Sequence, residues 1–209
     1  MLKVLIADDH EIVRRGLKHI LQEEFPFALI EEAFDTDSLV NKALANEWSI
    51  IVSDLAMPGG GGIDALLRIR QKTPATPVLI LSNYPEEQYA LRVMKAGASG
   101  YLNKDAAPEE LIIAVQRLLS GRHYITTEVE ERLAGSPNRH AEFSPHELLS
   151  EREFDVLILI ASGKSITAIA EQLSLRVTTV STYRARILSK MNARNNAELI
   201  QYGLENDLI

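Results

Sequence analysis

The sequence lacks several features that mark particular classes of protein. Its 209 residues include no cysteine, which excludes a disulfide framework, a cysteine-ligated metal and a cysteine nucleophile. No apolar run approaches the roughly 18 residues that a membrane span needs. The N-terminus also lacks the apolar core and the small-residue cleavage site of a secretory signal peptide. We therefore expect a cytoplasmic protein that has no membrane partner.

The usual signatures of an enzyme are missing as well. The sequence shows no Ser-His-Asp pattern and no glycine-rich phosphate-binding loop, so we expect no catalytic residues and no independent enzyme. A hydrophobic content of 46% with 24% charged residues is ordinary for a globular protein. The length suits one large domain or two small ones.

The net charge of −7 is distributed unevenly along the chain. Residues 1–122 carry 13 basic and 17 acidic side chains, and residues 123–149 carry 2 and 5, whereas residues 150–209 carry 7 of each. Within that last part, residues 172–197 hold five basic side chains and no acidic one. A basic segment in an acidic protein indicates a local site for a polyanion, unless acidic groups nearby in space cancel it.

Short apolar runs alternate with amphipathic patterns of helical period throughout residues 1–122. The runs predict five strands and the patterns between them predict five helices. This regular alternation favours a parallel sheet covered by helices on both faces. The predicted strands begin at or near Lys3, Ala28, Ile50, Pro77 and Tyr101, and the predicted helices contain Ile12–Leu21, Leu39–Leu44, Ile63–Ile69, Tyr89–Met94 and Leu111–Leu118.

The stretch from Ser49 to Gly59 combines a buried-strand pattern with a carboxylate at its end. Ile50–Val52 suits a strand that is buried on both faces, and Pro58 with the glycines after it stops the strand. Asp54 therefore lies at the carboxyl end of a central strand, where open α/β sheets place their ligand sites. The alternative is a loop aspartate that caps the next helix.

Polar side chains also follow the other predicted strands. Asp8 and Asp9 follow the first strand, Ser82 ends the fourth and Lys104 follows the fifth. Parallel strands share a carboxyl edge, so these side chains gather around Asp54. Three clustered carboxylates repel one another unless a cation joins them, and all-oxygen ligation suits Mg²⁺. Lys104 and Ser82 would then contact a phosphoryl group on Asp54. Individually, the aspartates suit a helix cap and Lys104 suits a solvated loop.

Residues 1–122 resemble the receiver domain of bacterial two-component response regulators. The resemblance implies that a sensor histidine kinase phosphorylates Asp54, and that Asp8, Asp9, Asp54 and the carbonyl of Ala56 hold Mg²⁺. It also implies that Ser82 contacts the phosphoryl group while Tyr101 turns inward. The fold class is then α/β, a flavodoxin-like, doubly wound, five-stranded parallel sheet. The matching segments are Ile6–His10, Asp54–Gly59, Ser82 and Tyr101–Lys104.

Residues 123–148 have the composition of a linker. The run from Gly135 to Asn138 is rich in turn formers, and the segment after it has no sustained period. Residues 126–134 are compatible with a short helix. We favour a tether in this region; the alternative is a helix that docks on the receiver.

Residues 149–209 predict a small all-α domain. Ser150 and Glu153 form a capping box for a helix that ends at Gly163, and further helices follow from Ser165, Val177 and Asn195. Two short helices before a longer one with a polar, basic face suit a helix-turn-helix. In the long helix the predicted buried stripe is Val180, Tyr183, Ile187 and Met191.

This domain resembles the LuxR-type output domain of the NarL/FixJ subgroup of response regulators. The resemblance implies binding to double-stranded DNA. Tyr183 stands where that subgroup often has histidine, so the DNA sequence is not implied. The matching segments are Leu149–Glu153, Gly163–Ile166, Ile169–Leu173, Thr179–Arg184 and Lys190–Asn192. The candidate DNA-contacting residues are Thr178, Thr179, Ser181, Thr182, Arg184, Ala185, Arg186 and Lys190.

We therefore expect a transcription regulator that is switched by phosphorylation. Phosphorylation would favour a homodimer that binds DNA, with RNA polymerase as a further candidate partner. The rival hypothesis is a signalling adaptor whose helical domain contacts proteins instead of DNA. The acid-free segment 172–197 favours DNA, because an adaptor has no need of it.

Overall fold

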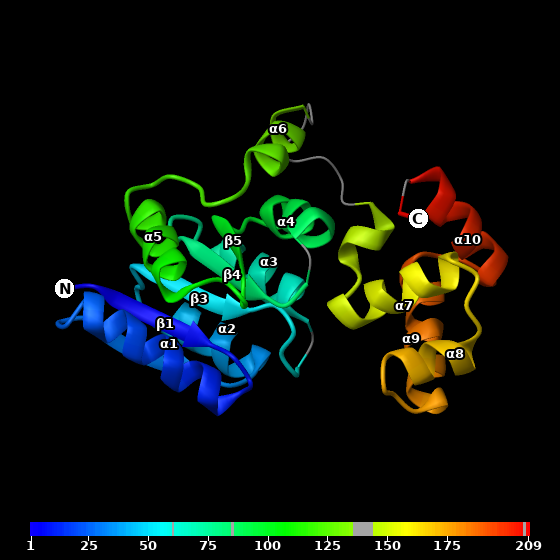
Figure 1. The fold of residues 1–209 in the computed structure, drawn as a ribbon, viewed down its shortest axis with the longest axis horizontal. Coiled ribbons are helices and arrows are strands. Elements are labelled where there is room, and N and C mark those ends of the chain that lie inside the picture. Colours follow the sequence, from blue (N-terminus) through cyan, green and yellow to red (C-terminus); the bar gives the residue numbers. More distant parts are fainter. Residues whose placement is uncertain (60, 85, 136–143, 207) are drawn as a thin grey trace. The chain divides into compact units, whose positions relative to one another are not determined.

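The computed structural model describes residues 1–59, 61–84, 86–135, 144–206 and 208–209 (Figure 1). The chain divides into two compact units, Met1–Ala141 and Glu142–Ile209. We describe each unit by itself. Among the described residues, no helix combines the length and the apolar character that crossing a membrane requires.

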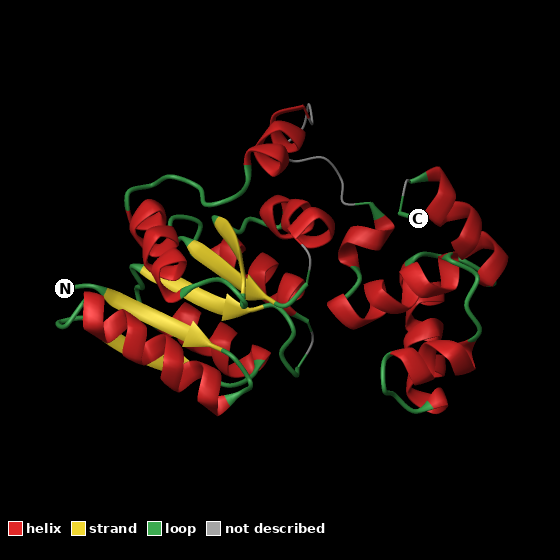
Figure 2. Cartoon of the chain, in the orientation of Figure 1, coloured by secondary structure: helices red, strands yellow, loops and turns green. Residues whose placement is uncertain are grey.

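The first unit is a five-stranded parallel sheet with the strand order β2-β1-β3-β4-β5, which is the flavodoxin-like order. Helices cover both faces (Figure 2); α1 contacts α5, and α2 contacts α3. The predicted fold of this part is confirmed. Its strands are β1 Lys3–Ala7, β2 Leu29–Ala33, β3 Ile50–Asp54, β4 Val78–Ser82 and β5 Gly100–Asn103, and its first five helices are α1 Glu11–Glu24, α2 Thr36–Ala45, α3 Gly62–Lys72, α4 Glu86–Lys95 and α5 Pro108–Leu119.

The position of each strand in the sheet explains its sequence. All five residues of β3 and of β4 are buried, as the continuous apolar runs predict for strands packed on both faces. β2 lies at an edge and is largely half-exposed, which lets it carry Glu31 and Glu32. The loop after β3 returns close to the end of the strand. A Cβ on Gly62 would lie 2.3 Å from the carbonyl oxygen of Leu55, which is too close for any side chain. This glycine therefore allows the tight turn that follows Asp54.

The structure differs from the predicted linker at both of its ends. Residues 123–126 lie beside β5, and a helix, α6 (Thr127–Gly135), contacts α4. The side chain of Val129 on this helix is buried. At the other end, residues 145–148 form the 3-10 helix η1, and the ring of His146 packs against Phe154 and Tyr202 of the second unit. The turn residues Ser136–Asn138 lie outside the described part.

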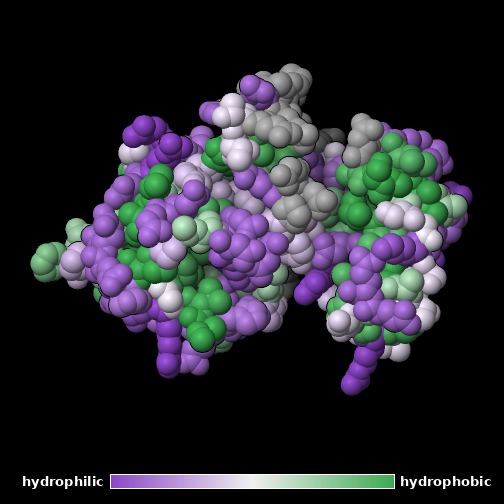
Figure 3. Space-filling view, viewed as in Figure 1, coloured by the Kyte–Doolittle hydropathy of each residue, from purple (hydrophilic) through white to green (hydrophobic). Residues whose placement is uncertain are grey.

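The second unit is all-helical, as predicted. Ser150, Ser165 and Asn195 cap the helices that follow them, as their side-chain oxygens suit. α7 packs against α8, α9 and α10, and the apolar residues between them form the core. On the face that Figure 3 shows, hydrophobic patches interrupt the hydrophilic surface of both units. The helices are α7 Glu151–Ala161, α8 Ile166–Gln172, α9 Val177–Lys190 and α10 Asn196–Glu205. The buried core residues include Val156, Leu157, Ile160, Ile169, Val180, Ile187 and Leu199.

Candidate functional site

Three predicted site residues meet at the carboxyl edge of the sheet. The Nζ atom of Lys104 lies 2.6 Å from Oδ2 of Asp8 and 2.9 Å from Oδ2 of Asp54. Asp8 and Asp54 are buried at 0% and 3% exposure. Burial on its own would lower the pKa of Lys104, but its hydrogen bonds to the two carboxylates outweigh burial and raise that pKa above its ordinary value. Lys104 is therefore a fixed positive charge beside Asp54.

Asp9 is the third carboxylate of this cluster, and the side chain of His10 contacts it. Nδ1 of His10 lies 2.8 Å from Oδ1 of Asp9 and 3.3 Å from Oδ1 of Asp8, and ligand atoms of these three residues lie within 4.8 Å of one another. Lys104 bridges the carboxylates of Asp8 and Asp54, and Asp9 adds a third carboxylate beside Asp8. The remaining negative charge and the oxygen donors fit a hard divalent cation such as Mg²⁺. The amide of Ala56 donates to Oδ1 of Asp54 over 3.2 Å.

Arg14, which was not among the predicted site residues, supports this cluster. Its Nη1 donates to the carbonyl oxygen of Asp8 over 2.8 Å, and its Nε donates to Glu32 over 3.3 Å. Among the described residues, no other hydrogen bond to the Asp8 carbonyl is found. Since Asp8 is fully buried, its carbonyl needs such a donor. Arg14 therefore fixes the backbone that carries Asp8, through a contact that the helical spacing of α1 alone does not reveal.

Ser82 and Tyr101 are joined through Tyr84. The amide of Tyr84 donates to Oγ of Ser82 over 3.1 Å, and the hydroxyl of Tyr101 donates to the carbonyl of Tyr84 over 2.7 Å. Tyr84 also stacks on Tyr89 of α4, with 4.4 Å between ring centroids. Tyr101 is only 1% exposed. Tyr101 is therefore buried, and Tyr84 links its hydroxyl to that of Ser82.

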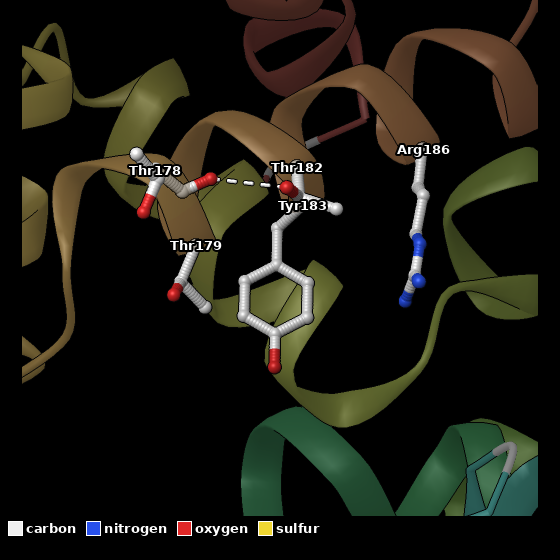
Figure 4. Close-up of a pocket in the computed structure, with 5 residues that line it drawn as sticks. All are labelled: Thr178, Thr179, Thr182, Tyr183 and Arg186. Carbon is white, nitrogen blue, oxygen red and sulfur yellow. Dashed lines mark hydrogen bonds between the residues drawn. The ribbon is translucent and has the colours of Figure 1, made fainter.

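The second unit presents the polar face of α9. Thr179, Tyr183 and Arg186 extend to one side of the helix and line a pocket together with Thr178 and Thr182 (Figure 4). The hydroxyl of Thr182 donates to the carbonyl of Thr178, 3.0 Å away. This face includes Tyr183, which we expected in the buried stripe. Tyr183 is only half-buried, because the stripe is centred on Val180 and Ile187, both fully buried.

The other predicted DNA-contacting residues are divided between exposed and paired positions. Ser181 and Ala185 are exposed on α9, and the Ser181 hydroxyl donates to the Val177 carbonyl. Nε of Arg184 donates to Asn196 over 2.6 Å, and Nζ of Lys190 lies 2.6 Å from Oε2 of Glu153.

Arg186 differs from these two basic side chains. Its guanidinium makes no hydrogen bond or ion pair within the part of the chain that the structure describes. Its charge is therefore available to an external anion, whereas those of Arg184 and Lys190 already have partners.

Lys190→Ala is expected to destabilise the second unit. The variant would leave the carboxylate of Glu153, which is 3% exposed, without its cation. Loss of one partner from a fully buried pair costs about 3–5 kcal/mol, and a half-exposed lysine reduces this to about 1–2 kcal/mol. Thermal unfolding measures the effect, with Arg186→Ala as the control. Equal melting temperatures for wild type and Lys190→Ala would contradict this role.

The effect of Lys190→Ala is also expected to depend on pH. Burial raises the pKa of Glu153, but the hydrogen bonds from Lys190 and Ser150 outweigh it and hold that pKa below its ordinary value of 4.5. A lowered pKa contributes stability above the unfolded-state pKa and loses it as the pH falls through the folded-state pKa. The difference between wild type and variant should therefore shrink in acid below about pH 4.5. A difference that grows in acid would exclude this assignment.

The fold and these two sites define a class of protein. Residues 4–116 match the family model "Response regulator receiver domain", and residues 147–203 match "Bacterial regulatory proteins, luxR family". The chain belongs to the response regulators, and it has the receiver and LuxR-type domains of the NarL/FixJ subgroup. It is a regulator of transcription with a LuxR-type DNA-binding domain, as its sequence indicated.

Individual relatives resemble the chain over nearly its whole length. Response regulator UvrY of Escherichia coli K12 is 35% identical over 211 residues, which cover 100% of this chain and 96% of UvrY. Oxygen regulatory protein NreC of Staphylococcus carnosus is 34% identical over 215 residues, covering 100% and 99%. Among solved structures, RcsB from Salmonella enterica serovar Typhimurium, bound to the promoter rprA in the presence of phosphomimetic BeF₃⁻, is 27% identical, with a TM-score of 0.57 over 97% of this chain and 98% of RcsB.

Proposed function

We propose that a sensor histidine kinase phosphorylates Asp54 and that this modification controls dimerisation and sequence-specific DNA binding. The observation that supports it best is the buried Lys104, which bridges Asp54 and Asp8 at 2.9 and 2.6 Å. A lysine shared between two buried carboxylates is well placed to bind oxygens of a phosphoryl group on one of them. The decisive experiment compares the DNA affinity of the whole chain before and after phosphorylation.

The residues around Asp54 have separate tasks in this proposal. A carboxylate oxygen of Asp54 forms the new O–P bond as the bond between phosphorus and the donor breaks. Lys104 and the hydroxyl of Ser82 contact the phosphoryl oxygens. The added charge of about −1.5 to −2 needs such partners in a buried site. When Ser82 turns toward the phosphoryl group, the amide of Tyr84 loses its acceptor, and the position of Tyr101 changes with it.

We propose that Asp8, Asp9, Asp54 and the carbonyl of Ala56 hold Mg²⁺. The bound ion would offset the negative charge of the carboxylates and of the phosphoryl oxygens. Asp8 and Asp54 also hold Lys104 in place, so the same two carboxylates would orient both Mg²⁺ and the ammonium group of Lys104.

Arg14→Ala is expected to weaken Mg²⁺ binding about tenfold, as is typical when a group that positions a metal ligand is removed. Arg14 holds the Asp8 carbonyl, whereas Arg15 is 76% exposed and pairs only with Glu11 among the described residues. Arg15→Ala is therefore a control of equal charge on the same helix. The measurement is an NMR titration with Mg²⁺ that follows the amides of Asp9 and Ala56. Similar affinities for both variants would contradict a positioning role for Arg14.

We propose that the exposed face of α9 contacts DNA. Arg186 is suited to guanine, because its fork of donors matches O6 and N7, and the threonines are small enough to let the helix approach the groove. Ser181, Ala185 and Thr178 lie on the exposed surface of the same helix. Two such modules in a dimer would contact half-sites about one helical turn apart.

The parts of the chain have distinct roles in this proposal. Residues 1–122 are the phosphoacceptor domain, residues 149–209 are the DNA-binding domain and residues 123–148 join the two. A protein that binds chromosomal DNA in a bacterium would act in the cytoplasm. RNA polymerase remains a candidate partner at the promoter.

A further inference from the structure

The first residues of the connecting segment lie against β5 instead of leaving the receiver. The amide of Tyr101 donates to the carbonyl of Tyr124 over 2.9 Å, and the amide of Tyr124 donates to the carbonyl of Ser99 over 3.2 Å. These bonds form a parallel bridge between Tyr124 and Gly100. Nδ1 of His123 lies 3.0 Å from the same Ser99 carbonyl. We call residues 123–126 the clasp.

Side chains of two helices hold the clasp. The hydroxyl of Tyr124 donates to Glu110 of α5 over 2.8 Å, and the guanidinium of Arg117 lies 5.7 Å from the centre of the Tyr124 ring. Burial and the bond to Glu110 raise the pKa of Tyr124 to about 12, so this hydroxyl keeps its proton at neutral pH. The amide of Thr126 donates to Glu86 of α4 over 2.9 Å. The clasp therefore connects α5, β5 and α4 just before α6 begins.

Gly100 is needed for this close approach. A Cβ on Gly100 would lie 2.9 Å from the carbonyl oxygen of Tyr124 and 3.1 Å from its Cβ. Backbone atoms at the first distance have little room to yield, so a side chain at position 100 would push the clasp away from β5. A change on β5 can thus displace the clasp without altering any residue of the clasp itself.

A continuous set of hydrogen bonds joins the clasp to the phosphoacceptor site. Ser82 accepts from the amide of Tyr84, the Tyr84 carbonyl accepts from the hydroxyl of Tyr101, and the amide of Tyr101 donates to Tyr124. The same residue, Tyr101, thus bonds through its side chain to the loop after β4 and through its backbone to the clasp. A movement of Tyr101 must alter at least one of the two.

We propose that Tyr124 is a positioning residue that couples Tyr101 to the segment leading to the DNA-binding domain. This inference rests on the proposed function. In the unphosphorylated protein the clasp lies on β5 and keeps α6 near α4. When Ser82 turns to the phosphoryl group, the shift of Tyr101 loosens the clasp and frees the connecting segment, which changes the freedom of the output domain to pair on DNA. Coupling of this kind is typically worth 5–150-fold in affinity.

The test uses the full chain and three variants. Tyr124→Ala removes the contacts that the Tyr124 ring and hydroxyl make with Arg117 and Glu110, and Gly100→Ala displaces the clasp from the other side of the bridge. The control is Arg122→Ala, since Arg122 is exposed and its side chain bonds only to Ser120 among the described residues. Phosphoryl uptake is measured by intact mass after incubation with a small acyl-phosphate donor and Mg²⁺. DNA affinity is measured with and without that treatment, on a duplex selected from a random pool by the phosphorylated wild type.

We expect all four proteins to take up one phosphoryl group. In wild type and Arg122→Ala, phosphorylation should raise DNA affinity about tenfold or more, whereas in Tyr124→Ala and Gly100→Ala the ratio should fall below about twofold. A wild type that takes up phosphate without a change in affinity would refute the proposed function. If phosphorylation raises the DNA affinity of the wild type, Tyr124→Ala and Gly100→Ala by the same factor, the coupling role of the clasp is wrong and the proposed function stands.

Hydrogen exchange on the wild type tests the same coupling without any substitution, and so does not depend on whether the variants fold. The amides of Tyr101 and Tyr124 are both hydrogen-bonded within the bridge, and protection of such amides reports local opening. We expect phosphorylation to speed exchange in peptides that contain residues 123–126 while the amides of β1 stay protected. Unchanged exchange at the clasp in a protein that has become phosphorylated would overturn the proposal.

Discussion

Asp54→Asn is expected to take up no phosphoryl group under conditions in which the wild type takes up one. The amide keeps the size of the carboxylate, so the buried position after β3 remains filled. It removes the nucleophilic oxygen and also the negative charge that binds Lys104 at 2.9 Å. Uptake should fall by at least about a hundredfold, which corresponds to about 2.7 kcal/mol in the barrier. Intact-mass measurement after incubation with an acyl-phosphate donor and Mg²⁺ gives the result.

Asp64→Asn is the matched control for this variant. Asp64 is exposed in the first turn of α3 and undergoes the same chemical change. It should be phosphorylated like the wild type. If Asp54→Asn gained the phosphoryl mass as readily as Asp64→Asn, the phosphoacceptor would have to be another residue.

Arg186→Ala is expected to reduce affinity for the selected duplex and to relax base preference. Arg186 is exposed on α9 and has no partner among the described residues. A bidentate contact to guanine is worth about 1–3 kcal/mol, so affinity for the selected duplex should fall about 5–150-fold. Affinity for random duplexes should fall much less. Binding titrations on both kinds of DNA, at several salt concentrations, separate the two effects.

Arg184→Ala is the control of equal charge on the same helix. The guanidinium of Arg184 is engaged by Asn196, so this change should leave base preference intact and at most weaken binding to all duplexes alike. Equal behaviour of the two variants would show that charge alone, and not base recognition by Arg186, explains the binding.

The sequence predicts the fold, and the meeting of Asp8, Asp54 and Lys104, because both depend on local patterns. Buried apolar runs define the strands of the sheet, and the residues that follow them must meet at one edge. Asp8, Asp54 and Lys104 lie together for this reason, although Asp8 and Lys104 are separated by 96 positions in the sequence. No knowledge of side-chain packing is needed for such a prediction.

The supporting contacts cannot be predicted in the same way. Arg14 donates to the backbone carbonyl of Asp8, and Tyr124 pairs through its backbone with Ser99 and Tyr101. The amphipathic pattern of a helix does not show such bonds. In α9 the pattern also fails at Tyr183, since a tyrosine is both apolar and polar and suits either face. The pairing of Lys190 with Glu153 spans 37 positions, so a lysine that looks available in the sequence is engaged in the fold.

The most direct test of the account is the DNA affinity of the whole chain as a function of Asp54 phosphorylation. Fluorescence polarisation on the selected duplex, with and without acyl-phosphate donor and Mg²⁺, should show about tenfold tighter binding by the phosphorylated wild type. Asp54→Asn should bind equally weakly under both conditions. Equal affinities for phosphorylated and unphosphorylated wild type, with uptake verified by mass, would contradict the claim that modification of Asp54 controls DNA binding.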